Sequence, residues 1–281
     1  GLSYLFGHDI PLDLLLLRRV DVRLFRHNRE VPQRNESQMM KRPETWMRDA
    51  LRTGFNALQA GDTDRAAACC RQVLEARQDI PEAHFLVGLV ALELGQRRTA
   101  ISAFGSVTTL EPEHGAAWAQ LARVLMQTGQ ILRAEEALQN AVRFADDQPV
   151  VCELVGHVHT LLGDDRAALD WHTRAVDGEP DNVSFLVSKA NCQLYCGELP
   201  ASEKTLQHAL ALAPGNCQAH WILAGLRKAT DRRHVEEMQR YLKEGHYAAR
   251  ARAFLSYAIG KELEDLEDWD GAFDAFHRGA S

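Results

Sequence analysis

Residues 81–114 read PEAHFLVGLVALELGQRRTAISAFGSVTTLEPEH, and residues 115–148, which follow directly, read GAAWAQLARVLMQTGQILRAEEALQNAVRFADDQ. The two segments agree at their small residues, because Gly95 and Gly129 are 34 residues apart and so are Ala100 and Ala134. The same spacing continues in both directions, to Gly61, Gly163, Gly197, Ala66, Ala168 and Ser202. A constant period of this length predicts a helix–turn–helix unit that stacks on its neighbours.

Each repeated column has a physical reason when the repeats are numbered from Met47 in steps of 34 residues. A small residue at position 8 lets the two helices of one repeat approach closely. The members of this column are Gly54, Gly88, Ala122, Gly156, Ala190 and Ala224. The glycine at position 15 suits the left-handed backbone that satisfies the last carbonyls of a helix. Proline at position 32 ends the second helix, as at Pro112, Pro180 and Pro214.

This pattern resembles the tetratricopeptide repeat, in which small residues at positions 8 and 20, glycine at 15 and proline at 32 recur. The resemblance covers residues 47 to about 229. It implies an all-α fold, a right-handed superhelix (α-solenoid) of about six to seven helix–turn–helix repeats. We expect an N-terminal helix and polar linker over residues 1–46, the solenoid over 47–230, and a divergent helix with a terminal helical pair over 231–281.

The pattern breaks in the sixth repeat and then resumes. Asp231 stands where glycine is expected, although residues 233–244 still have the spacing of a helix. Gly260 at position 8, Ala272 at position 20 and Phe276 at position 24 then indicate a seventh, divergent repeat.

Charge and composition limit the classes of partner. The net charge is −7, and a mildly acidic solenoid is a poor binder of polyanions because each phosphate contact needs a local cation, so we expect no nucleic-acid partner. No apolar stretch approaches the roughly 20 residues that span a bilayer, and no signal peptide is evident, so we expect a cytoplasmic protein without a membrane partner. The six cysteines form no CxxC pair and are interpreted as reduced, buried thiols.

The resemblance implies that the first helix of each repeat lines a concave groove. The residues at those positions are partly apolar, which indicates a protein or peptide partner. The candidate contacts are Phe85, Leu89, Glu93, Arg123, Met126, Gln127, His157, Asn191 and Tyr195. A chaperone-type carboxylate clamp is excluded, because its cationic positions hold Leu51, Ala116 and Gln120. Self-association is a further expectation, since exposed repeat ends often associate.

The residues do not indicate a reaction centre. Cys192 and Cys196 lie one helical turn apart, but a metal site needs three or four converging ligands, so no metal and no cofactor are expected. An acidic run between Glu262 and Asp270 is interpreted as a solvated helix face and turn. We therefore expect no catalytic residues and no enzymatic activity in this chain.

The C-terminal part carries a second resemblance. Residues 219–281, including 258–266 (AIGKELEDL) and 269–273 (WDGAF), resemble the repeat region of bacterial tetratricopeptide-repeat sulfotransferases. In that family a domain that uses 3′-phosphoadenosine 5′-phosphosulfate follows the repeats. The resemblance implies that this chain is a piece of a larger enzyme whose catalytic domain lies beyond Ser281. The alternative is a free-standing adaptor with no enzyme attached.

Overall fold

The protein is described by a computed structural model over residues 42–280, and within that range it contains helices and no strand. The all-α prediction is confirmed for these residues. The helix expected within residues 1–46 and most of the polar linker lie outside the described residues. The described residues divide into two compact units, residues 42–163 and residues 164–280.

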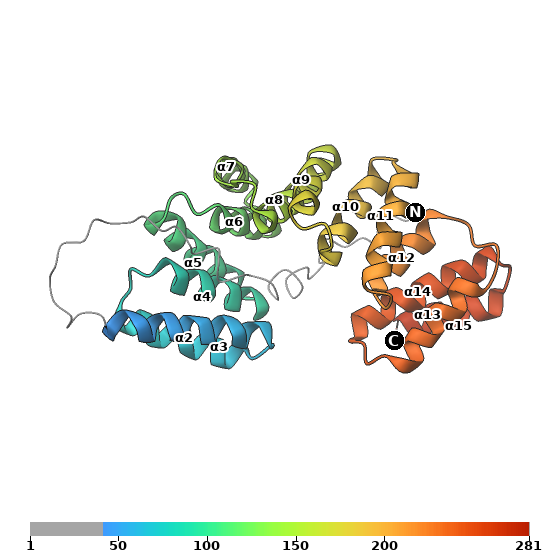
Figure 1. The fold of residues 1–281 in the computed structure, drawn as a ribbon, viewed down its shortest axis with the longest axis horizontal. Coiled ribbons are helices and arrows are strands. Elements are labelled where there is room, and N and C mark those ends of the chain that lie inside the picture. The colour runs from blue at the N-terminus through green and yellow to red at the C-terminus, as the bar shows by residue number, and fades with distance from the viewer. Residues whose placement is uncertain (1–41, 281) are drawn as a thin grey trace. The chain divides into compact units, whose positions relative to one another are not determined.

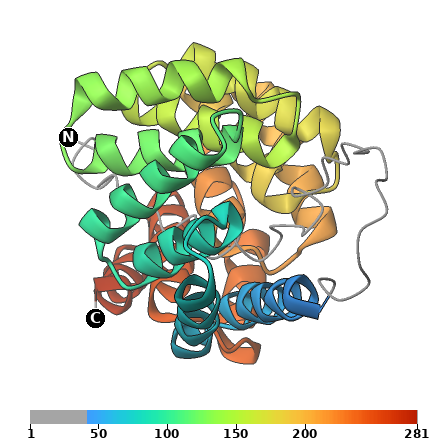
Figure 2. The same ribbon diagram turned by 90° about the vertical axis from the view of Figure 1, so that its left-hand side faces the viewer.

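The first unit consists of helical hairpins in chain order (Figures 1 and 2). Its helices are α2 (Arg42–Gln59), α3 (Thr63–Ala76), α4 (Pro81–Glu93), α5 (Arg97–Leu110), α6 (Gly115–Gln127), α7 (Ile131–Arg143) and α8 (Pro149–Leu162). The pairs α2–α3, α4–α5 and α6–α7 pack together, and each second helix also contacts the helix that follows it. The predicted helix–turn–helix order is therefore present here.

The second unit repeats this arrangement until its C-terminal third. Its helices are α9 (Asp165–Gly178), α10 (Val183–Tyr195), α11 (Leu199–Leu212), α12 (Cys217–Leu226), α13 (Arg233–Glu244), α14 (Ala249–Asp265) and α15 (Trp269–Ala280). Helices α10 and α11 form one hairpin and α14 and α15 another, and α12 packs directly against α14. The helix predicted over residues 233–244 is present as α13.

The glycine column adopts the predicted conformation. Gly61, Gly95, Gly129, Gly163 and Gly197 have φ values of 80°, 68°, 73°, 77° and 78°. Directly after Gly95, the Gln96 N–H donates to the Ala91 carbonyl at 2.7 Å, and Asp62 donates to Ala57 at 2.9 Å in the preceding repeat. These bonds satisfy carbonyls at the helix end that have no partner within the helix.

The small residues allow the close approach that their column predicts. A Cβ on Gly88 would lie 2.5 Å from the Phe104 ring, so only glycine fits where α4 crosses α5. A Cβ on Gly260 would lie 2.6 Å from the Phe276 ring, so the last hairpin repeats the contact of the second. This recurrence supports the register predicted for the seventh repeat.

That hairpin departs from the pattern at one turn. Glu267 occupies the glycine position between α14 and α15 and has φ +62°. The Asp268 N–H still donates to the Leu263 carbonyl at 2.9 Å, as in the repeats with glycine. The turn therefore has the same geometry as the earlier turns. Because Glu267 carries a Cβ, its left-handed backbone conformation is strained.

Candidate protein-binding surface

The candidate residues of the first unit divide into buried and accessible groups. Phe85 is 2% exposed and Leu89 is 0% exposed, and Arg123 is also buried. Glu93, Met126, Gln127 and His157 are half-buried. The interpretation of Phe85, Leu89 and Arg123 as residues that face an open groove is therefore corrected, because their side chains are covered within the folded chain.

Aromatic packing accounts for the position of Phe85. Its ring meets the Phe104 ring edge-on with centroids 5.5 Å apart, and it stacks on the His114 imidazole at 5.1 Å. Phe104 comes from the second helix of the same repeat, and His114 precedes α6 and accepts a hydrogen bond from the Ala117 N–H at 3.1 Å. Phe85 thus joins three consecutive elements of the core and is held on both sides.

Arg123 is held within its own helix. Its Nε and Nη2 atoms both donate to the Gln120 Oε1 atom, at 3.1 and 2.7 Å, and both residues are buried. Along α6, every residue from Ala119 to Leu125 is buried, whereas Met126 and Gln127, the last two residues, are half-exposed. Glu93 similarly ends α4. The accessible candidates therefore lie mainly at the C-terminal ends of first helices.

A buried carboxyl group accompanies His157 on α8. The Glu153 side chain is fully buried, and its Oε1 lies 3.1 Å from Nε2 of His157, one helical turn later. Because α8 packs against α6, this pair belongs to the same layer of first helices as Met126. The position of Glu153 was visible in the sequence, but its complete burial was not.

The second unit holds the remaining two candidates on α10. Asn191 is half-buried, and Tyr195, the last residue of that helix, is 44% exposed. Burial of part of its ring, with Asp165 and Cys192 nearby, raises the pKa of Tyr195, so this phenol stays neutral and can donate a hydrogen bond. Tyr195 occupies the same end-of-helix place in its repeat as Gln127 does in the third.

The sequence analysis missed a buried polar chain in the second unit. The Pro214 carbonyl lies 2.7 Å from His220 Nε2, His220 Nδ1 lies 2.8 Å from His234 Nε2, and His234 Nδ1 lies 2.7 Å from Glu262 Oε1. His220 and Glu262 are both buried. Burial lowers the pKa of His220, so its ring is neutral, donates from Nε2 to the carbonyl and accepts at Nδ1.

The interpretation of the acidic run as a solvated face is corrected in part, since Glu264, Glu267 and Asp270 are exposed but the other three members are not. Glu262 is buried, and Asp265 accepts a hydrogen bond from the Ala229 N–H at 2.8 Å. Asp268 pairs with Arg232 at 2.5 Å. The run therefore fixes the irregular segment between α12 and α13 onto α14. This anchoring replaces the missing second-helix packing of the sixth repeat.

Two of the buried cysteines have the properties of unreactive thiols. All six are unpaired with one another, and burial raises the pKa of Cys70 to about 12 and that of Cys217 to about 11. A thiol with such a pKa is not a nucleophile near neutral pH. Within residues 42–280, the His, Cys, Asp and Glu side chains form no group of three that could hold a metal ion. No helix in that range combines the length and apolar character needed to cross a bilayer.

Comparison with known proteins supports a tetratricopeptide-repeat domain. Two family models, both described as tetratricopeptide repeat, match residues 91–156 and 51–96. Mouse superkiller complex protein 3 is 30% identical over 156 residues, which is 54% of this chain and 10% of that protein. The chain thus spans about a tenth of the length of the curated relative that it matches.

Solved structures agree with this fold at low sequence identity. The human IFIT1 dimer with m7Gppp-AAAA has a TM-score of 0.68 at 18% identity, over 83% of this chain and 58% of that one. A thermophilic tetratricopeptide-repeat protein of Thermus thermophilus has a TM-score of 0.56 at 20% identity, over 64% and 98%. The Cut9–Hcn1 hetero-tetramer of the APC/C has a TM-score of 0.59 at 16% sequence identity, over 84% of this chain and 43% of that one. The fold is that of a tetratricopeptide solenoid, which suggests a protein-interaction scaffold.

Proposed function

We propose that this chain is a non-enzymatic scaffold that binds a peptide or protein segment at the C-terminal ends of its first helices. The proposal rests on the burial pattern of α6, which is buried over most of its length and becomes accessible at Met126 and Gln127. These two side chains offer an apolar contact and an amide, and α8, which carries His157, packs against α6. Phe85, Leu89 and Arg123 support this surface from beneath, because their own side chains are covered.

The charge at these helix ends favours a basic partner. The C-terminus of a helix carries a partial negative charge, and Glu93 adds a carboxylate at the end of α4. The net charge of −7 acts in the same direction over longer distances. We therefore propose a segment that combines apolar and basic side chains. Asn191 and Tyr195 form the corresponding contact in the second unit.

A charge-reversal pair tests this surface. The variant Met126→Lys with Gln127→Lys removes the apolar contact and repels a basic partner, and its matched control is Leu132→Lys, at an apolar residue on α7 that is 83% exposed. On an array of peptides that mix Arg, Lys and Leu, the double variant should bind about tenfold or more weakly than wild type, and the control should bind normally. Equal binding by all three proteins would remove the proposal.

We also propose that the chain is the repeat region of a sulfotransferase, with a free-standing adaptor as the alternative. Support comes from the resemblance of residues 219–281 described above. The test is the coding sequence that follows Ser281. A strand, a glycine-rich loop with Arg and Ser or Thr, and then a helix would support the sulfotransferase, as would sulfuryl transfer by the longer protein. A stop codon at that point would support the adaptor.

A nucleic-acid partner is the competing class, because IFIT1 was solved with capped RNA. The net charge of −7 disfavours it here, and we propose that no RNA is bound. A mobility-shift assay with capped and uncapped oligonucleotides should show no complex at moderate salt, and a salt-sensitive shift would refute this. We place the protein in the cytoplasm, where its thiols stay reduced.

Self-association remains part of the proposal. Trp269 and Phe273 are exposed large apolar residues one turn apart on α15. Light scattering across a concentration series should show a dimer for the wild type and a monomer for Phe273→Lys. A wild-type protein that is monomeric at all concentrations would exclude self-association.

A further inference from the structure

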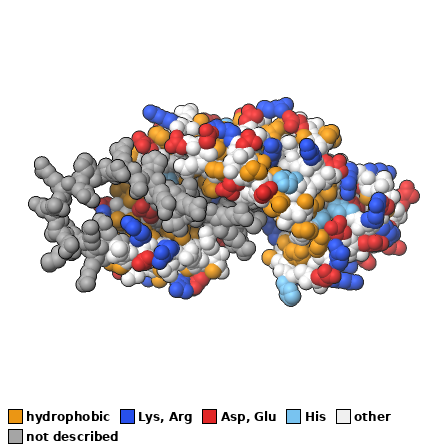
Figure 3. Space-filling view, in the orientation of Figure 1, with side chains coloured by type: hydrophobic (Ala, Val, Ile, Leu, Met, Phe, Trp, Pro, Cys, Tyr) orange, Lys and Arg blue, Asp and Glu red, His pale blue; other side chains and the backbone are white. Residues whose placement is uncertain are grey.

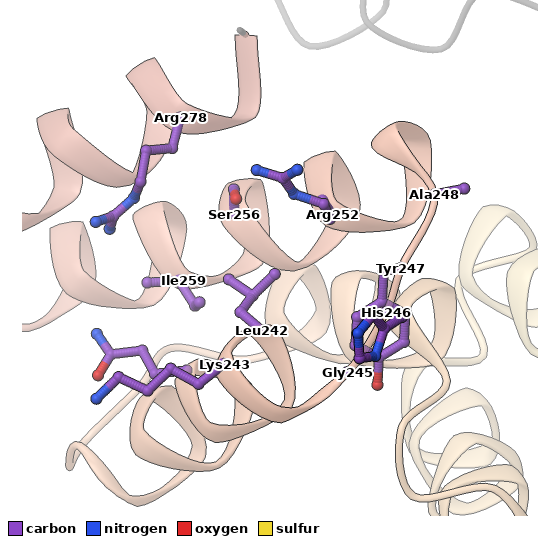
Figure 4. Close-up of a pocket in the computed structure, with 11 residues that line it drawn as sticks. Leu242, Lys243, Gly245, His246, Tyr247, Ala248, Arg252, Ser256, Ile259 and Arg278 are labelled. Carbon is purple, nitrogen blue, oxygen red and sulfur yellow. The ribbon is translucent and has the colours of Figure 1, made fainter.

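A cavity in the second unit lies on helices that hold none of the candidate contacts discussed above. It has a volume of about 680 Å³ and is bounded by α13, α14, α15 and the connecting residues 245–248 (Figure 4). Tyr247 forms part of the wall and is packed so closely on Gly245 that a Cβ there would lie 2.2 Å from the ring. The connection therefore has a fixed course beside the cavity.

The residues that line this cavity carry positive charge and no carboxylate. Lys243 comes from α13, Arg252 from α14 and Arg278 from α15, and His246 lies on the connection. Figure 4 shows these side chains on separate elements around the same space. None of the three permanent cations forms an ion pair with a described residue.

The other cations of the second unit include both paired and unpaired ones. Five of them have a carboxylate partner within 3.2 Å: Arg166, Arg227, Arg232, Arg233 and Lys261 pair with Glu198, Glu203, Asp268, Asp231 and Asp265. Against this background, three unpaired cations from three helices around one cavity form a distinct electropositive site.

The start of α14 adds to this positive potential. Its N-cap is Ala248, which provides no capping side chain, and the first turn contains no acid. Arg250 and Arg252 stand where acidic residues would be favourable, because the N-terminus of a helix carries a partial positive charge. The N-terminus of α14 therefore favours an anion nearby.

The side chain of Ser256 adds a hydroxyl group to the wall of the cavity. Ser256 lies one turn after Arg252 on the same face of α14, lines the cavity and is 5% exposed. Its hydroxyl group has no hydrogen-bond partner among the described residues. Leu242 and Ile259 form an apolar floor beside it. The cavity thus combines cations, an unsatisfied donor and an apolar surface.

We propose that this cavity binds a phosphate monoester with an apolar body. Two guanidinium groups and a hydroxyl group suit the oxygens of a phosphate dianion, which arginine binds through paired N–H donors. The apolar floor favours the ester, because inorganic phosphate would leave the half-buried Leu242 side chain uncovered. The volume is several times that of a phosphate group and accommodates such a body.

Titration with phenyl phosphate, inorganic phosphate and phenol, followed by two-dimensional NMR, tests this inference. Phenyl phosphate should bind with a Kd on the order of 1 mM or tighter and shift the amide signals around Ser256. Inorganic phosphate should bind several-fold more weakly, and phenol should not bind. Absence of saturable shifts with phenyl phosphate overturns the site, and equal binding of phosphate overturns the ester.

Matched variants separate a local site from general charge. Arg252→Gln and Arg278→Gln change exposed residues, and each should weaken phenyl phosphate binding about tenfold or more, with Ser256→Ala weakening it by about threefold. The control is Arg250→Gln, at a residue two positions before Arg252 that stacks over Phe254 at 5.6 Å and does not line the cavity. If Arg250→Gln weakens binding as much as Arg252→Gln, the attraction is unspecific and the site is refuted.

Discussion

Replacing Glu267 with glycine is expected to stabilise the protein. Glu267 has φ +62° in the turn between α14 and α15, where the earlier hairpins have glycine. Its side chain is exposed and makes no hydrogen bond or ion pair with the described residues, so its removal sacrifices no contact. The substitution therefore isolates the backbone strain at this position.

The magnitude follows from two opposing terms. A residue with a Cβ costs about 1–2 kcal/mol in the left-handed region, and glycine removes this cost. Glycine also makes the unfolded chain more flexible, which opposes the gain by about 0.4–1 kcal/mol. The net gain in the free energy of unfolding is about 1 kcal/mol, which corresponds to an increase in Tm of about 2–4 °C for a chain of this size.

Urea and thermal unfolding, followed by circular dichroism and by tryptophan fluorescence, measure this change. The matched control is Glu264→Gly, at an exposed glutamate inside α14 only three residues earlier. It should lower the stability by about 1 kcal/mol, because glycine is unfavourable within a helix. If Glu267→Gly also destabilises the protein, the strain at this turn is absent and the argument fails.

Three further predictions concern other contacts. Gly88→Ala should lower the free energy of unfolding by about 1–3 kcal/mol, because its Cβ would lie 2.5 Å from a buried ring on α5. Gly105→Ala, whose Cβ would meet nothing within 4 Å, should raise it by about 0.5–1 kcal/mol, and similar urea midpoints for the two variants would contradict both predictions. Burial lowers the pKa of His114 below 6.5, so the unfolded chain binds the proton more readily and stability falls as the pH drops below 6.5. His114→Asn keeps a helix cap and should reduce the change in the free energy of unfolding with pH by about 1.4 kcal/mol per pH unit in acid titrations. An unchanged pH dependence would exclude His114 as its source. Ser202→Ala should lower the free energy of unfolding by about 1 kcal/mol, because the hydroxyl donates to the buried Ala190 carbonyl at 2.7 Å, and calorimetry showing no loss would refute it.

The sequence predicts those features that depend on local sterics. Gly95 takes a left-handed conformation because its neighbours end one helix and begin another, and this rule needs no tertiary information. The strained turn at Glu267 also had a signal. Glycine precedes the small residue of position 20 by five residues in the earlier repeats, as Gly95 precedes Ala100, and Glu267 precedes Ala272 by the same number.

Burial of the candidate contacts was harder to predict. The repeat position gives the direction of the Phe85 side chain, but not the rings of Phe104 and His114 that cover it. The burial of Glu262 could be predicted, because most residues of its column are buried and apolar, as Val90 and Val124 are. Its histidine partner could not, since His234 comes from the segment where the repeat pattern fails.

The chain of hydrogen bonds from Pro214 through His220 and His234 to Glu262 has a mechanical consequence. A stack of hairpins ordinarily frays from its end, one unit after another, since each unit contacts only its neighbours. Here, peeling α14 away would break the hydrogen bond between Glu262 and His234 of α13 and, in the same event, the direct packing of α14 on α12. We therefore expect that, when the C-terminus is pulled in an optical trap, α12, α13, α14 and α15 extend in a single step, and that Glu262→Leu divides this step into two.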